Sequence, residues 1–248
     1  MITPLPVRVT PGPSEAMDSY IERVAAANAL AITPFTRHLK RLSGSTLRFL
    51  NAAPSPELVA TLARLTDTPE SALHELTLSR YEVVPKIHNH HRYAARAASA
   101  KGWFSLIRTQ ACPACVGEGQ PWASYWRLPW MTACLKHGCL LITRCPGCRV
   151  KLRSTRLQGL RASGFTPFCG NPRATGRVPQ CEQDLGTAIR VPAESPIFAQ
   201  QKVVLAALRG STVFCHGEPV TGTEYLRRAR SIAVLLFHTV AISTATGL

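Results

Sequence analysis

The residues best suited to chemistry in this sequence are cysteines and histidines in closely spaced pairs. Two residues separate Cys112 from Cys115, and two separate Cys134 from His137, after an interval of 18 residues. Each pair can form a tight turn that directs two ligand atoms at one ion, and the interval allows the second turn to lie opposite the first. The spacing therefore predicts a tetrahedral zinc site with three cysteines and one histidine.

A second site is predicted to begin at Cys145 and Cys148, whose intervening Pro-Gly favours the turn that directs both sulfur atoms at one ion. It needs two more ligands, and Cys169 and Cys181 are the cysteines that follow before the final helices. Eleven residues separate them instead of two, so we expect a looped insertion between these ligands. Four protein ligands leave no coordination position for water, so both zinc sites are expected to be structural.

The remaining cysteines are expected to lie outside these sites. Cys139 begins an apolar stretch, where a buried thiol is the default interpretation, and competition with His137 for the first ion is the alternative. Cys215 has no nearby base oriented by a third group, so we assign it no catalysis. The histidines of the basic stretch after Tyr81 are expected to be solvated or to face phosphate, and not to bind a third metal. They are His88, His90 and His91.

The sequence contains none of the common catalytic motifs that we sought. It has no P-loop, no H-E-x-x-H and no G-x-S-x-G, and its 14 acidic residues give poor support to a two-metal nuclease. We expect no enzyme activity, with a nuclease or zinc hydrolase as a minor alternative. Prolines interrupt the first 13 residues, so no signal peptide is indicated and a cytoplasmic protein is expected. The apolar run 233–243 is shorter than the ~20 residues that span a bilayer, and it is predicted to be a buried helix.

Basic residues exceed acidic ones by 29 to 14, which gives a formal charge of +15. Seven thiolates and two zinc ions would lower this only to about +12. Such an excess favours an anionic partner such as nucleic acid. The alternative is an arginine-rich coding bias that places the charge on solvated faces.

Amphipathic helices are predicted on both sides of the cysteine-rich segment, from apolar residues at three- and four-residue spacing. They are expected to begin near Ser14, Thr33, Ser55, Thr68, Ser195 and Thr223. Gly44 is expected to end the second helix. The third and fourth are joined by a very short turn, and LARLTDTPESALHELT across it resembles a helix-turn-helix unit. Such pairs also form plain cores or protein-binding surfaces, so DNA contact is one of two interpretations.

The fold class expected is mostly α-helical with small zinc-ribbon or knuckle modules. Residues 81–111 are basic and are expected to form a connector or an exposed face, and helical periodicity is lost after Cys112. We divide the chain into an N-terminal helix-turn-helix-like domain (1–100), a double zinc-binding domain (101–190) and a C-terminal helical subdomain (191–248).

These motifs together resemble one known family. The opening LPVRVTPGPSEAMDSYIERVAAANAL, the pair CPAC and the string YWRLPWMTACLKHGCLLITRCPGC are similar to the TniQ family of transposon target-selection proteins, which includes the TnsD proteins. The resemblance covers roughly residues 1–190. It implies an N-terminal helix-turn-helix domain and zinc binding by the C-x2-C and C-x2-H pairs. The wide spacing of Cys169 and Cys181 departs from the close pair usual in the family.

The resemblance implies a non-catalytic adaptor. Members of the family recognise an attachment site or a CRISPR effector complex and recruit an AAA+ ATPase that brings the transposase. The length of 248 residues is toward the short end, as in members that work with guide-RNA systems. The expected partners are therefore a TnsC-like AAA+ ATPase and DNA or a guide-RNA effector complex, and a homodimer is possible. The alternative function is a stand-alone zinc-containing helix-turn-helix transcription regulator.

Basic side chains are the candidates for contact with nucleic acid or a partner. Those selected are Arg37, Lys40, Arg41, Arg92, Arg96, Lys101 and Arg127. Trp126 and Trp130 flank Arg127 in the first zinc loop. Two interpretations stay open: the tryptophans pack the zinc module beside a surface arginine, or all three belong to a docking face.

Overall fold

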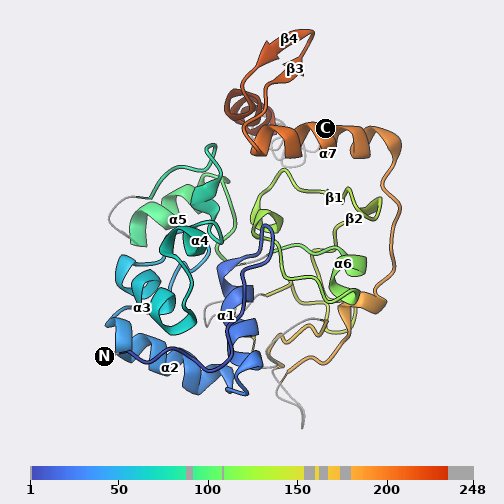
Figure 1. Cartoon of the computed structure of the whole chain (residues 1–248). Helices are drawn as coiled ribbons and strands as arrows, with labels where there is room; N and C mark the ends of the chain where they lie inside the picture. Colours follow the sequence, from blue (N-terminus) through green and yellow to red (C-terminus); the bar gives the residue numbers. More distant parts are fainter. Residues whose placement is uncertain are drawn as a thin grey trace, which may run out of the picture.

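The computed structural model describes residues 2–87, 92–107, 109–153, 160–161, 167–173 and 180–233. The α-helices are α1 (Met17–Ala27), α2 (Ile32–Ser43), α3 (Pro56–Thr66), α4 (Glu70–His74), α5 (Arg92–Ala100), α6 (Pro113–Gly117) and α7 (Ser195–Leu208) (Figure 1). Short 3-10 helices are η1 (Leu78–Arg80), η3 (Ser124–Arg127) and η4 (Leu185–Thr187). Helical conformation also extends over residues 222–233.

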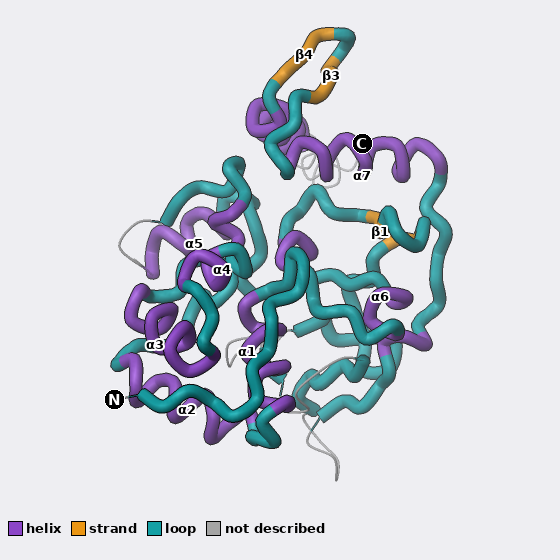
Figure 2. Tube along the Cα trace, viewed as in Figure 1, coloured by secondary structure: helices purple, strands orange, loops and turns teal. Residues whose placement is uncertain are grey.

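The strands are short and form two antiparallel hairpins. β1 (Ala133–Cys134) pairs with β2 (Cys139–Leu140), and β3 (Val213–Cys215) pairs with β4 (Glu218–Val220). Figure 2 shows that loops form most of the chain between α6 and α7. The mostly helical fold class is thus confirmed, whereas the β3–β4 hairpin is not among the predicted elements.

Helices α1 to α4 share one hydrophobic core. α3 begins as predicted, because the Ser55 hydroxyl accepts a hydrogen bond from the Leu58 amide at 3.2 Å and Pro56 occupies the first turn. Gly44 ends α2 as predicted, with a left-handed φ of 64° that glycine adopts without strain. The core includes Met17, Tyr20, Ile21, Val24, Phe35, Leu39, Leu58, Leu62, Leu73 and Leu76.

Three of these helices begin at residues other than those predicted, and one of them is α4, which begins at Glu70 after Pro69 instead of at Thr68. α1 begins at Met17 because Ser14, the expected first residue, has a left-handed φ of 56°. α2 begins at Ile32, so Thr33 lies inside the first turn instead of capping it. In α1 and α2 an alanine without a capping side chain precedes the first turn, which explains why the capping pattern did not locate the start.

The prediction that residues 81–111 form a connector or an exposed face is wrong for much of that stretch. α5 lies within it and buries Ala95 and Ala98, whose small side chains give a weak apolar signal in the sequence. Large side chains on either side of α5 are also buried: Tyr81, Val83, Val84 and Phe104. The histidines at 88, 90 and 91 lie outside the described residues.

A second hydrophobic core includes the buried side chains of the cysteine-rich segment. Trp122 and Trp126 pack edge to face in it, with ring centroids 5.5 Å apart. η4 lies against α6, and a side chain on Gly186 would meet the Cα atom of Gly117 at 2.6 Å. This close contact between two backbones holds the end of the cysteine-rich segment against its beginning.

α7 joins the C-terminal part to this segment. The Gln201 side chain is buried, and its Oε1 atom accepts hydrogen bonds from the Thr132 amide at 2.7 Å and the Ala133 amide at 3.0 Å. The β3–β4 hairpin projects away from the remainder of the molecule (Figure 1). The run 233–243 lies, apart from its first residue, outside the described part of the chain. Among the described helices, none combines the length and apolar character needed to cross a membrane.

Candidate metal centres

The first predicted group of ligands comes from α6 and the β1–β2 hairpin. Cys112 caps the N-terminus of α6, and its sulfur accepts a hydrogen bond from the Cys115 amide at 3.5 Å. Cys134 ends β1, and His137 lies in the turn before β2. Their ligand atoms lie within 4.8 Å of one another, so the structure brings together the four residues selected from the sequence.

The distances within this group match a tetrahedral ion. The Nδ1 atom of His137 lies 3.4 Å from the sulfur of Cys112, 3.3 Å from that of Cys115 and 3.5 Å from that of Cys134. The sulfurs of Cys115 and Cys134 are 3.7 Å apart. Zinc bonds of about 2.3 Å to sulfur and 2.1 Å to nitrogen give tetrahedral edges of about 3.6 to 3.8 Å. The donor set and its spacing therefore fit one metal ion.

Cys139 lies beside this group without belonging to it. Its sulfur is 3.6 Å from that of Cys112, but it is not among the four residues whose ligand atoms are all mutually close. The side chain is buried, and burial raises the pKa of the Cys139 thiol to about 12. This agrees with the buried thiol expected from the sequence.

The second group is formed by Cys145, Cys148, Cys169 and Cys181, whose sulfurs also lie within 4.8 Å of one another. The sulfur of Cys145 is 3.8 Å from that of Cys181, and the sulfur of Cys148 is 3.9 Å from that of Cys169. A disulfide would require about 2.05 Å. All four cysteines are free, so this group also could hold a metal ion.

The wide spacing of Cys169 and Cys181 has a simple structural basis. Residues 168–172 and 180–184 run antiparallel, with bridges from Phe168 to Asp184 and from Pro172 to Gln180. The Cys169 amide donates to the carbonyl of Gln183 and the Cys181 amide donates to that of Asn171. The two cysteines are therefore held together across paired backbones, and not by one tight turn. The Cys181 thiol is partly desolvated, yet hydrogen bonds led by that from the Gln183 amide lower its pKa to about 7.

A carboxylate outside the first group orients its histidine. The Nε2 atom of His137 donates to one oxygen of Glu118 at 2.8 Å, and Lys136 donates to the other at 2.5 Å. These two hydrogen bonds, that from Lys136 first, lower the pKa of Glu118. With its proton on Nε2, the imidazole presents the Nδ1 lone pair to the thiolates, which is the arrangement in carboxylate–histidine–zinc sites.

We expect Glu118→Gln to weaken zinc binding at the first group by about tenfold, because outer hydrogen-bond partners of metal-bound histidine typically contribute 10- to 100-fold. Competition with a chromophoric chelator measures this change. Glu182→Gln is the matched control, since Glu182 is an exposed carboxylate next to Cys181. Equal affinities of wild type and Glu118→Gln would contradict an orienting role.

Most of the basic residues selected as contact candidates are exposed, and one of them is buried. Arg37, Lys40 and Arg41 on α2 are exposed, as are Arg96 and Lys101. The side chain of Arg92 lies outside the described part. Arg127 contradicts the prediction: its side chain is 3% exposed and pairs with Asp18 at 2.6 Å, so it is not a surface contact. Trp126 is buried as well, which supports the packing interpretation, and Trp130 is partly buried.

Arg127 belongs to a buried ion-pair network that the sequence did not suggest. Arg153 pairs with Asp18 at 2.9 Å and with Glu22 at 3.0 Å, and Arg161 pairs with Glu22 at 2.8 Å. All five side chains are at most 3% exposed. Both carboxylates come from α1 and all three arginines come from the cysteine-rich segment. The network therefore ties the N-terminal helices to the part of the chain that carries the candidate metal ligands.

An aromatic ring completes this network. The guanidinium carbons of Arg153 and Arg161 lie 4.6 and 5.2 Å from the centre of the Trp122 ring, within the range of cation–π attraction. Burial alone would raise the pKa of Asp18, but the charges of Arg153 and Arg127 outweigh it and lower that pKa to about 2. Asp18 is therefore ionised at neutral pH. One sequence signal was available: Asp18 and Glu22 lie four residues apart on a helix that also carries the apolar residues Met17, Tyr20, Ile21 and Val24.

Comparison with known proteins agrees with this geometry. No curated protein matches the chain. A family model described as TniQ matches residues 6–141, which is more than half of the 248 residues. The matched segment contains α1 to α4 and the whole first group of ligands. The chain therefore belongs to the TniQ family.

Proposed function

We propose that this protein is a non-catalytic adaptor of DNA transposition that links recognition of a target site to an AAA+ ATPase. The observation that carries the proposal is the match to the TniQ family over residues 6–141, which indicates a transposition-associated protein. The recognised target would be DNA or a guide-RNA effector complex. The basic charge of +15 supports contact with nucleic acid in either case.

The two groups of ligands support a scaffolding role for metal. We propose zinc in both, because sets of four thiolates, or of three thiolates and one imidazole, are those of structural zinc sites. The ion would neutralise the clustered thiolates and crosslink chain segments that have few strands or helices of their own. With four protein ligands each, neither ion would have a position open to substrate, which is why we propose no enzyme activity.

The helix pair α3–α4 is the candidate helix-turn-helix unit, and its charges favour contact with protein over contact with DNA. The N-terminal residues of a recognition helix face the base edges in a major groove. Here α4 has five residues, begins at the exposed Glu70 and is followed by the exposed Glu75. Asp67 in the preceding turn is exposed too. Glu70 would repel phosphate, and Asp67 and Glu75 pair with Arg8 and Arg80, so we assign nucleic-acid contact to basic residues elsewhere, such as Arg96 and Lys101.

The buried ion-pair network joins the first two of the three proposed units, which meet near residue 100. Asp18 and Glu22 of the first unit are neutralised by arginines of the second. Separating the two units would break these ion pairs and expose the faces that bury them. We therefore propose that the first two units fold together.

The test is co-migration with a TnsC-like AAA+ ATPase in size-exclusion runs with DNA and a non-hydrolysable ATP analogue. The adaptor proposal predicts a shared peak. Separate peaks with and without DNA and nucleotide would contradict it. A footprint on one promoter, in the absence of any transposon protein, would instead support the alternative of a transcription regulator.

A further inference from the structure

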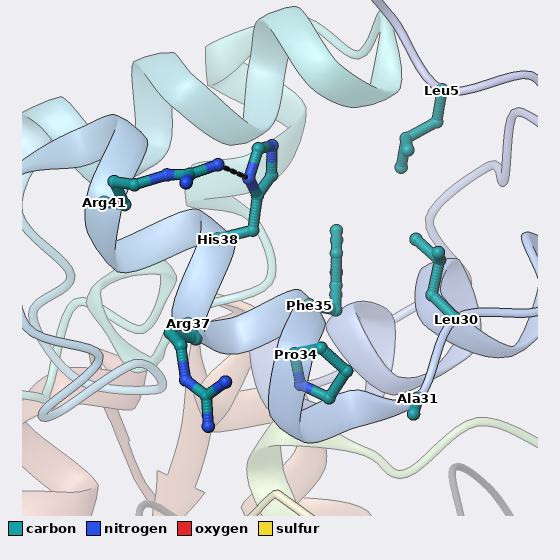
Figure 3. Close-up of a pocket in the computed structure, with 8 residues that line it drawn as sticks. All are labelled: Leu5, Leu30, Ala31, Pro34, Phe35, Arg37, His38 and Arg41. Atoms are coloured by element: carbon teal, nitrogen blue, oxygen red, sulfur yellow. Dashed lines mark hydrogen bonds between the residues drawn. The ribbon is translucent and has the colours of Figure 1, made fainter.

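A groove lies beside α2, on the side that faces the N-terminal segment and the loop between α1 and α2. Its volume is about 490 Å³, within the size range of sites that enclose a small ligand or a few side chains. Figure 3 shows Leu5, Leu30 and Phe35 directed toward the same space from three different segments. The groove is thus formed by the folded N-terminal region and not by one helix alone.

The floor of the groove is apolar. Leu5, Leu30, Ala31, Pro34 and Phe35 line it, and Leu30 is 39% exposed although it is a large apolar side chain. An exposed leucine at the edge of an apolar depression loses contact with water when another apolar group covers it. Such burial contributes about 25 cal/mol for each Å² removed from water. The floor therefore favours an occupant with a bulky apolar group.

The rim of the groove is basic. Arg37, His38 and Arg41 line it, and α2 contains no acidic residue. Among the described residues, neither arginine forms an ion pair with a carboxylate, and Arg41 instead donates to Nδ1 of His38 at 2.9 Å. Figure 3 shows Arg37 leaving the helix in a different direction from His38 and Arg41. The cations therefore border the apolar floor at separate points.

We infer that this groove binds an acidic, amphipathic segment of a partner protein. A bulky apolar side chain of the segment would cover Leu30 and Phe35, and its carboxylates would pair with Arg37 and Arg41. This is the mode in which an amphipathic helix lies in an apolar groove, with charge complementarity that fixes its orientation. The inference goes beyond the proposed function, because it does not require that the partner be the ATPase.

Nucleic acid fits this groove less well. A phosphate backbone has no apolar group to cover the floor, and binding of single strands relies on aromatic faces on which bases stack. Two rings line the groove: Phe35 is 4% exposed, and the His38 ring accepts a hydrogen bond from Arg41. The arginines alone would attract phosphate, so nucleic acid is the competing outcome that the experiment must separate.

The experiment selects binders from a display library of random 12-residue peptides on the full-length wild-type protein. Enriched peptides are then synthesised, and their affinities are measured by fluorescence anisotropy against three variants. Arg37→Glu/Arg41→Glu reverses the rim, and Leu30→Ser removes an apolar side chain. Arg48→Glu/Arg64→Glu is the control, since both residues are exposed, lie outside the groove and give the same change in net charge.

The expected result is enrichment of peptides that combine Asp or Glu with bulky apolar residues. Reversal of the rim charges should weaken the binding of these peptides about tenfold or more, because like charges placed in contact oppose binding. Leu30→Ser should weaken peptide binding by a smaller factor, and the control variant should bind the peptides with wild-type affinity. Thermal melts check that every variant is folded.

Three outcomes would overturn the inference. Enriched peptides could lack acidic residues, or they could bind the rim variant as tightly as wild type. Alternatively, no peptide could be enriched while a labelled DNA duplex or single strand loses affinity for the rim variant but not for the control, which would identify a nucleic-acid surface. None of these outcomes depends on whether the protein co-migrates with the ATPase.

Discussion

Removal of zinc by a strong chelator is expected to abolish the cooperative fold of residues 112–185. Structural zinc contributes about 10 to 16 kcal/mol in small zinc modules, which equals or exceeds the 5 to 15 kcal/mol by which domains are usually stable. The described residues between Cys112 and Leu185 contain only a five-residue helix, a short 3-10 helix and one hairpin with two-residue strands, so regular secondary structure contributes little to holding them. Circular dichroism and amide hydrogen exchange, with and without chelator, measure the loss.

Single cysteine variants test how many metal ions each chain binds. Cys169→Ser should reduce bound zinc from two ions to one per chain in native mass spectrometry. Cys215→Ser should leave two ions, because Cys215 lies outside both groups of ligands. Two ions in Cys169→Ser, or a purified wild-type protein without tightly bound metal, would contradict the proposed sites.

Asp18→Asn is expected to destabilise the protein by about 3 to 5 kcal/mol, the usual cost of removing one partner of a buried ion pair. Asp18 is fully buried, and the substitution removes the carboxylate charge that pairs with Arg127 and one of the two carboxylate charges that pair with Arg153. The free energy of unfolding from urea titration measures the effect. Amide hydrogen exchange shows which parts of the protein are destabilised, and it should increase in α1 and in the cysteine-rich segment together.

The control for this variant makes the same chemical change at the surface. Asp67 pairs with Arg8, and both side chains are more than half exposed. Asp67→Asn should therefore cost no more than about 1 kcal/mol, as exposed pairs do. A similar loss of unfolding free energy in both variants would show that burial does not increase the contribution of the Asp18 ion pairs.

Local patterns in the sequence were enough to find the metal ligands. Cys112 with Cys115, and Cys134 with His137, are neighbours along the chain, so their spacing reports the turns that join them. The start of α3 follows from its capping serine in the same way, whereas α7 begins at Ser195 as predicted although no side chain caps it. Cys169 and Cys181 were found by elimination, and their antiparallel pairing has no signature in the spacing itself.

Long-range contacts were not predictable by these means. The pair between Asp18 and Arg127 joins residues 109 positions apart, and no periodicity reports such a partner. A buried arginine has the same sequence appearance as an exposed one, which is why Arg127 was assigned to the surface. α5 was missed because alanines form its inner face. The β3–β4 hairpin did leave a signal in Gly217, because the two-residue turn of His216 and Gly217 has positive φ at both positions and glycine adopts this conformation readily.

The pairing of residues 168–172 with 180–184 has a consequence for how such proteins vary. Because the facing backbones place the two sulfurs, the number of residues that join Pro172 to Gln180 is free to change. Doubling the length of a connecting loop typically costs only about 0.6 kcal/mol of chain entropy. Natural insertions and deletions can therefore accumulate at this point while the metal site survives. Sequence searches that demand a close final pair of cysteines would overlook proteins that bind two ions.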